Sequence, residues 1–261
     1  MSGNVATHDG ASGVHTITID RETKRNALDR TTLHELEEAF TDASARSEVR
    51  VIVLRGAGDR AFCAGADLAE VLGHASLDES RKHFDGVARV MRAMERAPQP
   101  VIARVPGFAL AGGCGLAVAA DFTLASESAV FGLPEIALGL LPLMVSAPIL
   151  RAVGSRKVLI DLVLTGRRVG AVEARELGLA TRVVPDAELD GELAALAEQL
   201  AGYSPLALRF GKEALYTMAE METNAALTYL RDAIVLVSRS DDAREGITAF
   251  FEKRKPRWTG R

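Results

Sequence analysis

The sequence predicts an α/β fold, and three observations support that prediction. Short apolar runs typical of buried strands alternate with longer segments of helical periodicity, which indicates parallel strands joined by helical crossovers. After Ser155 strands become scarce and helices dominate. Of the 261 residues, 48% are hydrophobic and 25% are charged, which is typical of a globular protein with a large core.

Four strands are expected in the first half of the chain. Between Val14 and Asp20, Ile17 and Ile19 alternate with threonines, as in a half-buried strand. Three further runs are almost continuously apolar, as in strands covered on both faces, and occupy Val49 to Leu54, Val101 to Val105 and Phe122 to Ala125. The expected helices between these strands run from Asp29 to Ser47 and from Arg81 to Arg96.

The second half of the chain is expected to be mainly helical. Helices are predicted at Arg156 to Leu164, Val172 to Leu177, Asp186 to Tyr203, Pro205 to Glu220, Thr223 to Ser238 and Asp241 to Arg254. No Gly/Ser-rich linker precedes them. We therefore expect a core at residues 1–200 and a helical C-terminal region at 201–261 that serves oligomerisation and covers a site, rather than an independent domain.

Composition and charge exclude several classes of protein. The net charge of −4 disfavours a general nucleic-acid-binding surface. No run approaches the roughly 20 apolar residues of a membrane span. Residues Met1 to Gly13 do not read as a signal peptide, so a cytoplasmic location is expected.

The cysteines and histidines predict neither a metal site nor a catalytic thiol. Cys63 and Cys114 are expected to be small packed residues in a reducing compartment. None of the five histidines lies at the short spacing typical of metal ligands, so no metal is expected.

A first candidate site is the segment Phe62 to Leu68, directly after a predicted strand. Its small residues Ala64, Gly65 and Ala66 leave backbone groups open to a ligand. The same pattern also fits a tight strand-to-helix connection with Asp67 as the helix cap, and both interpretations stay open.

A second candidate site is the segment Gly107 to Leu116. Glycines at a helix start expose the unpaired N–H groups of the first turn, where the helix dipole favours a negative atom. Gly113 and Gly115 also fit a G-x-G dinucleotide motif, but Val118 stands where a third glycine is needed, and five extra residues separate the strand from the glycines.

A third candidate is Glu135, a lone carboxylate among Phe131, Leu133, Ile136 and Leu138. An apolar setting disfavours ionisation, so this group could exchange a proton near neutral pH. By itself the pattern is better explained by a surface glutamate that begins a short helix after proline.

Taken together, these segments resemble the crotonase, or enoyl-CoA hydratase/isomerase, family from about Val14 to Lys255. The matching motifs are Arg25-Asn26-Ala27-Leu28, Ala64-Gly65-Ala66-Asp67, Gly112-Gly113-Cys114, Leu133-Pro134-Glu135 and Ala249-Phe250-Phe251-Glu252-Lys253-Arg254. The resemblance implies a ClpP/crotonase fold of repeated ββα units with a helical C-terminal trimerisation region. It also implies a homotrimer or a dimer of trimers, an acyl-CoA substrate and no separate cofactor.

The resemblance assigns a role to each matching position. The N–H groups of Ala66 and Gly112 would polarise the thioester carbonyl, and Glu135 would transfer protons at the α or γ carbon. The positions implied to contact CoA or the acyl group are Lys24, Arg25, Ala27, Ala64, Asp67, Leu68, Gly113, Pro134, Phe250 and Lys253. Phe250 and Lys253 would act in the same subunit or in a neighbouring one.

One departure from the family affects which reaction is expected. Hydratases of this family usually carry two glutamates, and Gly115 stands at the first of these positions. A lone Glu135 suits the 3,2-enoyl-CoA isomerase reaction better than water addition. Asp67 or Glu70 could supply a second carboxylate, but a helix cap and an exposed helix residue are the expected roles.

A second departure follows Glu135. Leu140 to Ser146 replaces a glycine-rich stretch, which indicates a bulkier, more apolar acyl pocket.

Outside the enzymatic interpretation, a non-catalytic acyl-CoA-binding protein is the main alternative. A serine hydrolase is disfavoured because the chain has no G-x-S-x-G motif and no histidine after His83, whereas a thioesterase or decarboxylase of the same family stays open.

Overall fold

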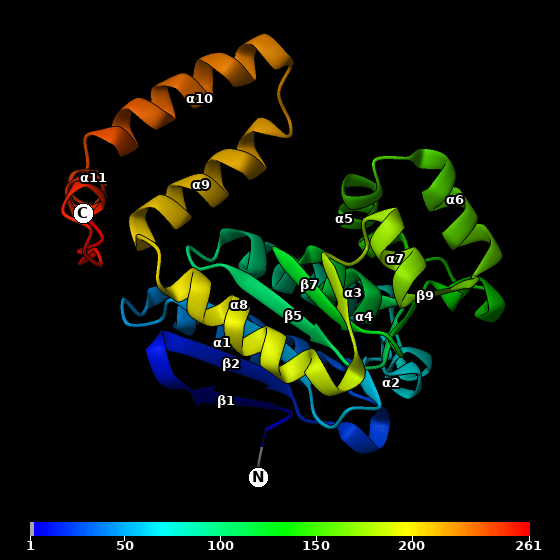
Figure 1. Cartoon of the computed structure of the whole chain (residues 1–261). Coiled ribbons are helices and arrows are strands. Elements are labelled where there is room, and N and C mark those ends of the chain that lie inside the picture. Colours follow the sequence, from blue (N-terminus) through cyan, green and yellow to red (C-terminus); the bar gives the residue numbers. More distant parts are fainter. Residues whose placement is uncertain (1–2) are drawn as a thin grey trace.

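Two β-sheets form the centre of the protein, whose computed structural model describes residues 3–261 (Figure 1). The larger sheet contains, in order across it, β1 (Val5–Asp9), β2 (Val14–Ile19), β3 (Val51–Gly56), β5 (Val101–Val105), β7 (Phe122–Ser126) and β10 (Arg182–Val184). The smaller sheet contains β4 (Ala61–Cys63), β6 (Phe108–Leu110), β8 (Val130–Gly132) and β9 (Arg168–Gly170). Strands β2, β3, β5, β7 and β10 run parallel, and β1 is antiparallel to β2.

The chain repeats a strand–strand–helix unit three times. Strands β3, β5 and β7 of the large sheet are each followed by β4, β6 and β8 of the small sheet, which are parallel to one another. A helical segment follows each pair of strands, and the first two of these segments lead directly to the next strand of the large sheet. These segments are α2 (Leu68–Gly73) with α3 (Leu77–Arg96), then α4 (Gly112–Ala119), then the 3-10 helix η3 (Pro134–Leu138) with α5 (Leu143–Val153). The repeated ββα units expected from the sequence are therefore confirmed.

Helices bury the two faces of the large sheet. On one face α1 (Arg30–Ala45) turns Leu33, Leu36 and Phe40 into the core and packs beside α3. On the other face α8 (Leu189–Ala201) runs across the strands, and its leucines pack on Val51 and Ile102 (Figure 1). Burial on both faces explains why the central strands read as continuous apolar runs.

The remaining elements differ from the sequence predictions in a few places. Helices α6 (Arg156–Thr165) and α7 (Ala171–Leu177) lie where helices were expected. The short 3-10 helices η1 (Ala11–Gly13) and η2 (Glu22–Lys24) were not predicted, and a third, η4 (Asp186–Glu188), lies at the start of a predicted helix. Helix α3 begins four residues earlier than Arg81, because the Ser76 hydroxyl accepts the N–H of Glu79 and caps it. The helix expected from Asp186 to Tyr203 is divided between η4 and α8.

Three C-terminal helices extend away from the sheets (Figure 1). They are α9 (Pro205–Met218), α10 (Thr223–Ser238) and α11 (Asp241–Phe251). Helix α10 buries none of its side chains in this chain and exposes Leu227, Ile234, Val235 and Leu236. Within residues 3–261, no helix is both long and apolar enough to cross a membrane.

Candidate active site

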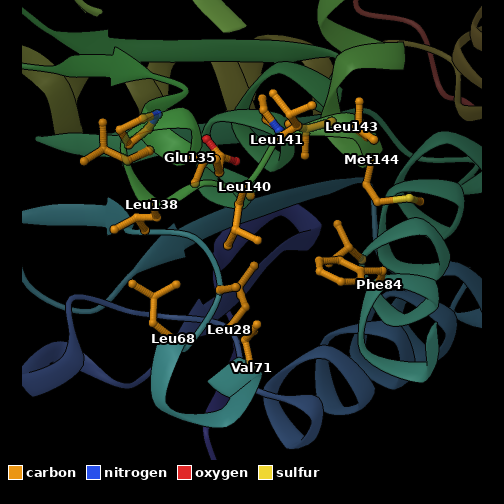
Figure 2. Close-up of a pocket in the computed structure, with 18 of the residues that line it drawn as sticks. Leu28, Leu68, Val71, Phe84, Glu135, Leu138, Leu140, Leu141, Leu143 and Met144 are labelled. Carbon is orange, nitrogen blue, oxygen red and sulfur yellow. The ribbon is translucent and has the colours of Figure 1, made fainter. Parts of the chain in front are cut away.

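A cavity of about 470 Å³ lies between the loop that precedes α2, helices α2 and α3, and the η3–α5 segment. Apolar side chains from all of these elements line it, among them Leu28, Leu68, Val71, Phe84, Leu138, Leu140, Leu141, Leu143 and Met144 (Figure 2). Glu135 is the one carboxylate that lines it in the described chain. The cavity therefore suits an apolar group that reaches a single proton-transferring side chain.

The loop before α2 leaves the N–H group of Ala66 without a partner. Leu28 donates its N–H to Gly65 O at 2.8 Å and accepts the N–H of Asp67 at 2.8 Å, so the bonds on either side of Ala66 are used. Across residues 3–261 the N–H of Ala66 itself makes no hydrogen bond. Gly65 has φ +94°, and a Cβ there would collide with Ala111, so this turn requires glycine.

The second free amide belongs to Gly112, the first residue of α4. Ala111 precedes it with φ +53° and ψ −127°, a strained conformation that is held by the bond from its N–H to Gly132 O at 2.8 Å. An N–H in the first helical turn has no intrahelical acceptor, and the helix dipole favours negative charge there. A Cβ built on Gly112 would lie 3.9 Å from Ala66 N, which places the two free amides side by side at the cavity wall.

Glu135 lies on the same cavity wall at the start of η3. Pro134 occupies the first helical position and fixes the entry to this turn. The Oε2 atom of Glu135 is buried and makes no hydrogen bond with the described residues. Burial raises the pKa of the Glu135 carboxyl above its ordinary value, because the charged form is poorly solvated. The interpretation of Glu135 as an ordinary surface residue is wrong.

The position of the missing second carboxylate is filled by another helix. A Cβ on Gly115 would overlap the side chain of Val145 on α5, and Gly115 is buried in α4. Two residues earlier, Gly113 is equally crowded, because a Cβ there would overlap the carbonyl oxygen of Cys63. Gly113 therefore permits close packing of α4 on β4, and it does not line the cavity.

Asp67 is held by two cations and caps α2. Its Oδ2 accepts from Arg21 at 2.9 Å and from Lys24 at 2.8 Å, and its Oδ1 accepts the N–H of Ala69 at 3.2 Å. The bond from Lys24 is the largest cause that lowers the pKa of Asp67 to about 2. The carboxylate is thus a structural anchor rather than a free second base.

The comparisons with known proteins identify the family. Its profile, described as enoyl-CoA hydratase/isomerase, matches residues 9–261. This chain belongs to the enoyl-CoA hydratase/isomerase family. It is 39% identical over 251 residues to a carnitinyl-CoA dehydratase of Escherichia coli K12, a match that covers 94% of each chain.

Solved enoyl-CoA hydratase structures have the same fold. One from Mycobacterium smegmatis superposes with a TM-score of 0.94 at 35% identity and covers 98% of this chain and 99% of its own. One from Bacillus anthracis gives 0.93 at 36% identity and covers 99% and 100%. The resemblance to an enzyme family with the crotonase fold is therefore confirmed.

The residues that the family resemblance suggested are only partly brought together. Ala64, Ala66, Leu68, Gly112, Pro134 and Glu135 line the cavity. Lys24 and Arg25 lie at the neighbouring turn, where Arg25 O accepts the N–H of Ala64 at 3.0 Å and Ala27 O accepts from Arg21. Phe250 on α11 and Lys253 just after it are exposed, and neither lines the cavity. In Figure 1, α11 lies on the opposite side of the molecule from α2 and α5, which line the cavity.

Burial also accounts for the two cysteines. Cys63 and Cys114 are both buried, and desolvation raises the pKa of each thiol to about 12. A thiol with so high a pKa is almost entirely un-ionised at neutral pH and is a poor nucleophile. Neither cysteine lines the cavity in the described chain.

Sequence reasoning missed three sets of residues around the site. Arg21 is nearly buried and pairs with Asp67 and Asp29, and Asn26 donates to Ala57 O and Ala61 O to hold the turn. Arg21 lies four residues before the Arg25-Asn26-Ala27-Leu28 motif, and Asn26 lies within it. This motif was the signal from which the sequence analysis could have found both residues.

The third missed set lies on α2 and α3. Glu70 is not the exposed helix residue that was expected, because it accepts the N–H of Arg30 at 3.0 Å and lies beside His74 and His83. Of these three, His83 lines the cavity.

Proposed function

We propose that this enzyme moves a proton on an enoyl-CoA thioester whose acyl group is apolar, with Glu135 as its single acid–base residue. The observation that carries the proposal is the pair of free amides at Ala66 and Gly112 beside a carboxyl that is buried in an apolar cavity. Two such donors match the oxygen of a thioester carbonyl, on which negative charge grows as an enolate forms.

The proposed reaction moves the double bond of the acyl chain from between C3 and C4 to between C2 and C3. Ionised Glu135 removes a proton from C2 of a 3-enoyl thioester, and the electron pair moves onto the carbonyl oxygen held by Ala66 and Gly112. The dienolate then takes the same proton back from Glu135 at C4, which leaves the double bond between C2 and C3. Glu135 ends in its starting state, so no cofactor is needed, and CoA is part of the substrate.

Among residues 3–261 a single carboxylate lines the cavity, and this supports the reaction over hydration. Addition of water requires one group to activate the water and another to protonate the carbon. The place of a second carboxylate is occupied by Val145 against Gly115, and Asp67 is engaged by Arg21 and Lys24. One carboxyl is sufficient to carry a proton from C2 to C4.

Reversible hydration is the second candidate. The named relatives favour it, because one is called a carnitinyl-CoA dehydratase and the solved structures are called enoyl-CoA hydratases. A carnitinyl group carries a quaternary ammonium, which proteins recognise with aromatic rings or carboxylates. The cavity offers Phe84 among many aliphatic side chains and Glu135 as its carboxylate, so its lining favours a plain hydrocarbon chain.

CoA binding and self-association are part of the same proposal. The cations Lys24 and Arg25 lie in the turn whose backbone accepts the N–H of Ala64, a cavity-lining residue, and they suit the CoA phosphates. Phe250 and Lys253 lie on and just after α11, a helix that is distant from the cavity-lining helices α2 and α5 of the same chain (Figure 1). We therefore assign them to CoA bound by a neighbouring subunit of a trimer or a dimer of trimers.

The deciding experiment offers the protein a 3-enoyl-CoA and a trans-2-enoyl-CoA of equal, medium chain length. The native enzyme should convert the 3-enoyl substrate faster than it hydrates the 2-enoyl substrate. Glu135→Gln should lose about 10²–10⁴-fold in kcat for the isomerisation, the usual contribution of a positioned acid–base group. Exposed Glu127→Gln is the matched control and should retain full activity.

Two outcomes would overturn parts of this proposal. Faster water addition than isomerisation by the native enzyme would establish hydration as the reaction. Full activity of Glu135→Gln would remove this residue from the mechanism and return the protein to the class of acyl-CoA-binding proteins without turnover.

A further inference from the structure

Glu70, His74 and His83 form a cluster of potential metal ligands beside the acyl cavity. Glu70 and His74 are four residues apart at α2 and its C-cap, and His83 lies on α3. One ligand atom from each residue lies within 4.8 Å of the other two. Glu70 Oε1 lies 3.7 Å from His74 Nε2 and 3.5 Å from His83 Nδ1.

His83 is the unexplained member of this cluster. Its side chain is fully buried, yet neither ring nitrogen makes a hydrogen bond with any residue of the described chain. The nearest acceptor, Glu70 Oε1, lies 3.5 Å from His83 Nδ1, so this buried imidazole is poorly satisfied. A cation between the two groups would give His83 the partner that it lacks.

The other two residues already have the partners that metal ligands use. The second ring nitrogen of His74, Nδ1, lies 3.3 Å from the hydroxyl of Ser80. The carboxylate of Glu70 accepts the backbone N–H of Arg30 at 3.0 Å. Hydrogen bonds of this kind orient the ligating atoms of histidine and carboxylate side chains around a metal.

We infer that Glu70, His74 and His83 bind one divalent transition-metal cation, for which Zn²⁺ is the probe. Zinc takes two histidines and one carboxylate at about 2.0–2.2 Å and keeps a fourth position for water. Bonds of that length separate neighbouring ligand atoms by about 3.3–3.5 Å in a tetrahedron, close to the two distances from Glu70. Only the two imidazoles need to approach each other.

Binding at this place would fasten two elements of the cavity wall. Helix α2 begins two residues after Ala66, whose amide is one of the two free donors, and α3 contributes Phe84 and Val87 to the cavity. A cation held by both helices would therefore fix the distance between the loop that carries Ala66 and the side chains of α3 that line the cavity. This inference does not depend on which reaction the enzyme performs.

The test measures Zn²⁺ binding by calorimetry on chelator-treated, full-length protein without a histidine tag. The native protein should bind one Zn²⁺ per chain. His74→Ala and Glu70→Gln should each lower the affinity at least about tenfold, which is the effect of losing even an outer partner of a metal ligand. Both variants leave the buried His83 in place.

Exposed His34 provides the matched control. It lies 3.4 Å from Glu38 at the same four-residue spacing, but on the surface of α1 and without a third ligand. His34→Ala should bind Zn²⁺ as the native protein does, and Co²⁺ in the native site should give the intense visible absorption of a tetrahedral complex. Absence of Zn²⁺ binding, or binding that His74→Ala and Glu70→Gln leave unchanged, would overturn the inference.

Discussion

Glu135 shows how the surroundings of one residue change its chemistry. Its carboxyl projects among leucines of η3 and the segment that follows it (Figure 2). Because Oε2 is buried without a hydrogen bond in the described chain, ionisation is opposed and the pKa is raised. A carboxyl with a raised pKa is a better proton acceptor when ionised and also exchanges protons closer to neutral pH.

The raised pKa of Glu135 should be measurable as pH-dependent stability. A carboxyl whose pKa is higher in the folded than in the unfolded protein makes the folded state less stable as the pH rises. The loss is complete once the pH has passed the folded-state pKa. Glu135→Gln stays neutral, so its melting temperature should exceed that of the native protein at pH 7.5. The difference should shrink as the pH falls toward the ordinary glutamate value of 4.5, measured by thermal unfolding.

The exposed Glu127→Gln variant serves as the control for this measurement. It should follow the native protein across the pH range. Equal melting temperatures for Glu135→Gln and the native enzyme at pH 7.5 would contradict a buried, poorly solvated carboxyl.

At the scale of elements, the packing of α4 on α5 decides how many carboxylates the cavity holds. Gly115 lets the two helices approach so closely that Val145 fills the space of any larger side chain. The sequence of the segment after Glu135, with Leu140, Leu141 and Leu143, then supplies apolar lining. The contact between α4 and α5 thus leaves no room for a carboxylate at position 115. The same segment, 140–145, gives the cavity its apolar lining.

The contact between α4 and α5 can be tested with glycine substitutions. Gly115→Ala should destabilise the protein by roughly 1–3 kcal/mol, because its Cβ overlaps Val145. Gly211→Ala, in α9 with open space around it, should instead stabilise by about 0.4–1 kcal/mol. Chemical denaturation measures both changes.

A double variant shows whether Val145 is the cause. Gly115→Ala combined with Val145→Ala should recover part of the lost stability, because the smaller side chain on α5 leaves room for the new methyl group. Additive effects of the two substitutions would show that the strain arises elsewhere.

For the whole molecule, the C-terminal helices are joined to the core but leave apolar surface exposed. Lys212 on α9 pairs with Asp121 at 2.8 Å and donates to Met94 O at 2.9 Å, which ties this helix to the sheet. Ile234 on α10 and Phe250 on α11 stay exposed. Apolar surface of this extent is typical of subunit interfaces.

We expect the native protein to form trimers or dimers of trimers through α9, α10 and α11. Ile234→Glu should shift the mass measured by light scattering toward the monomer, because a charge would be buried at the interface. Leu164→Glu, at a leucine of similar exposure on α6, should leave the mass unchanged. A native protein that is monomeric at micromolar concentration would contradict this expectation.

The local pattern of the sequence was sufficient for the large sheet and most helices. Strands β2, β3, β5 and β7 were predicted to within about two residues, because strands buried on both faces read as continuous apolar runs. The small sheet was missed because each of its strands has three residues, too few to show a period. Helix α5 was missed because Pro148 lies inside it.

For the candidate site, the sequence by itself determined the chemically suited groups: small residues at Ala66 and Gly112, a lone Glu135, and Gly115 where a second glutamate was absent. Only the tertiary structure decided that both amides are free and adjacent, that Glu135 is desolvated, that Val145 closes the space beside Gly115, and that Glu70, His74 and His83 converge. The reason is physical: residue type and local conformation are encoded over a few neighbours. Burial, pKa and ligand geometry depend on which distant segments pack together.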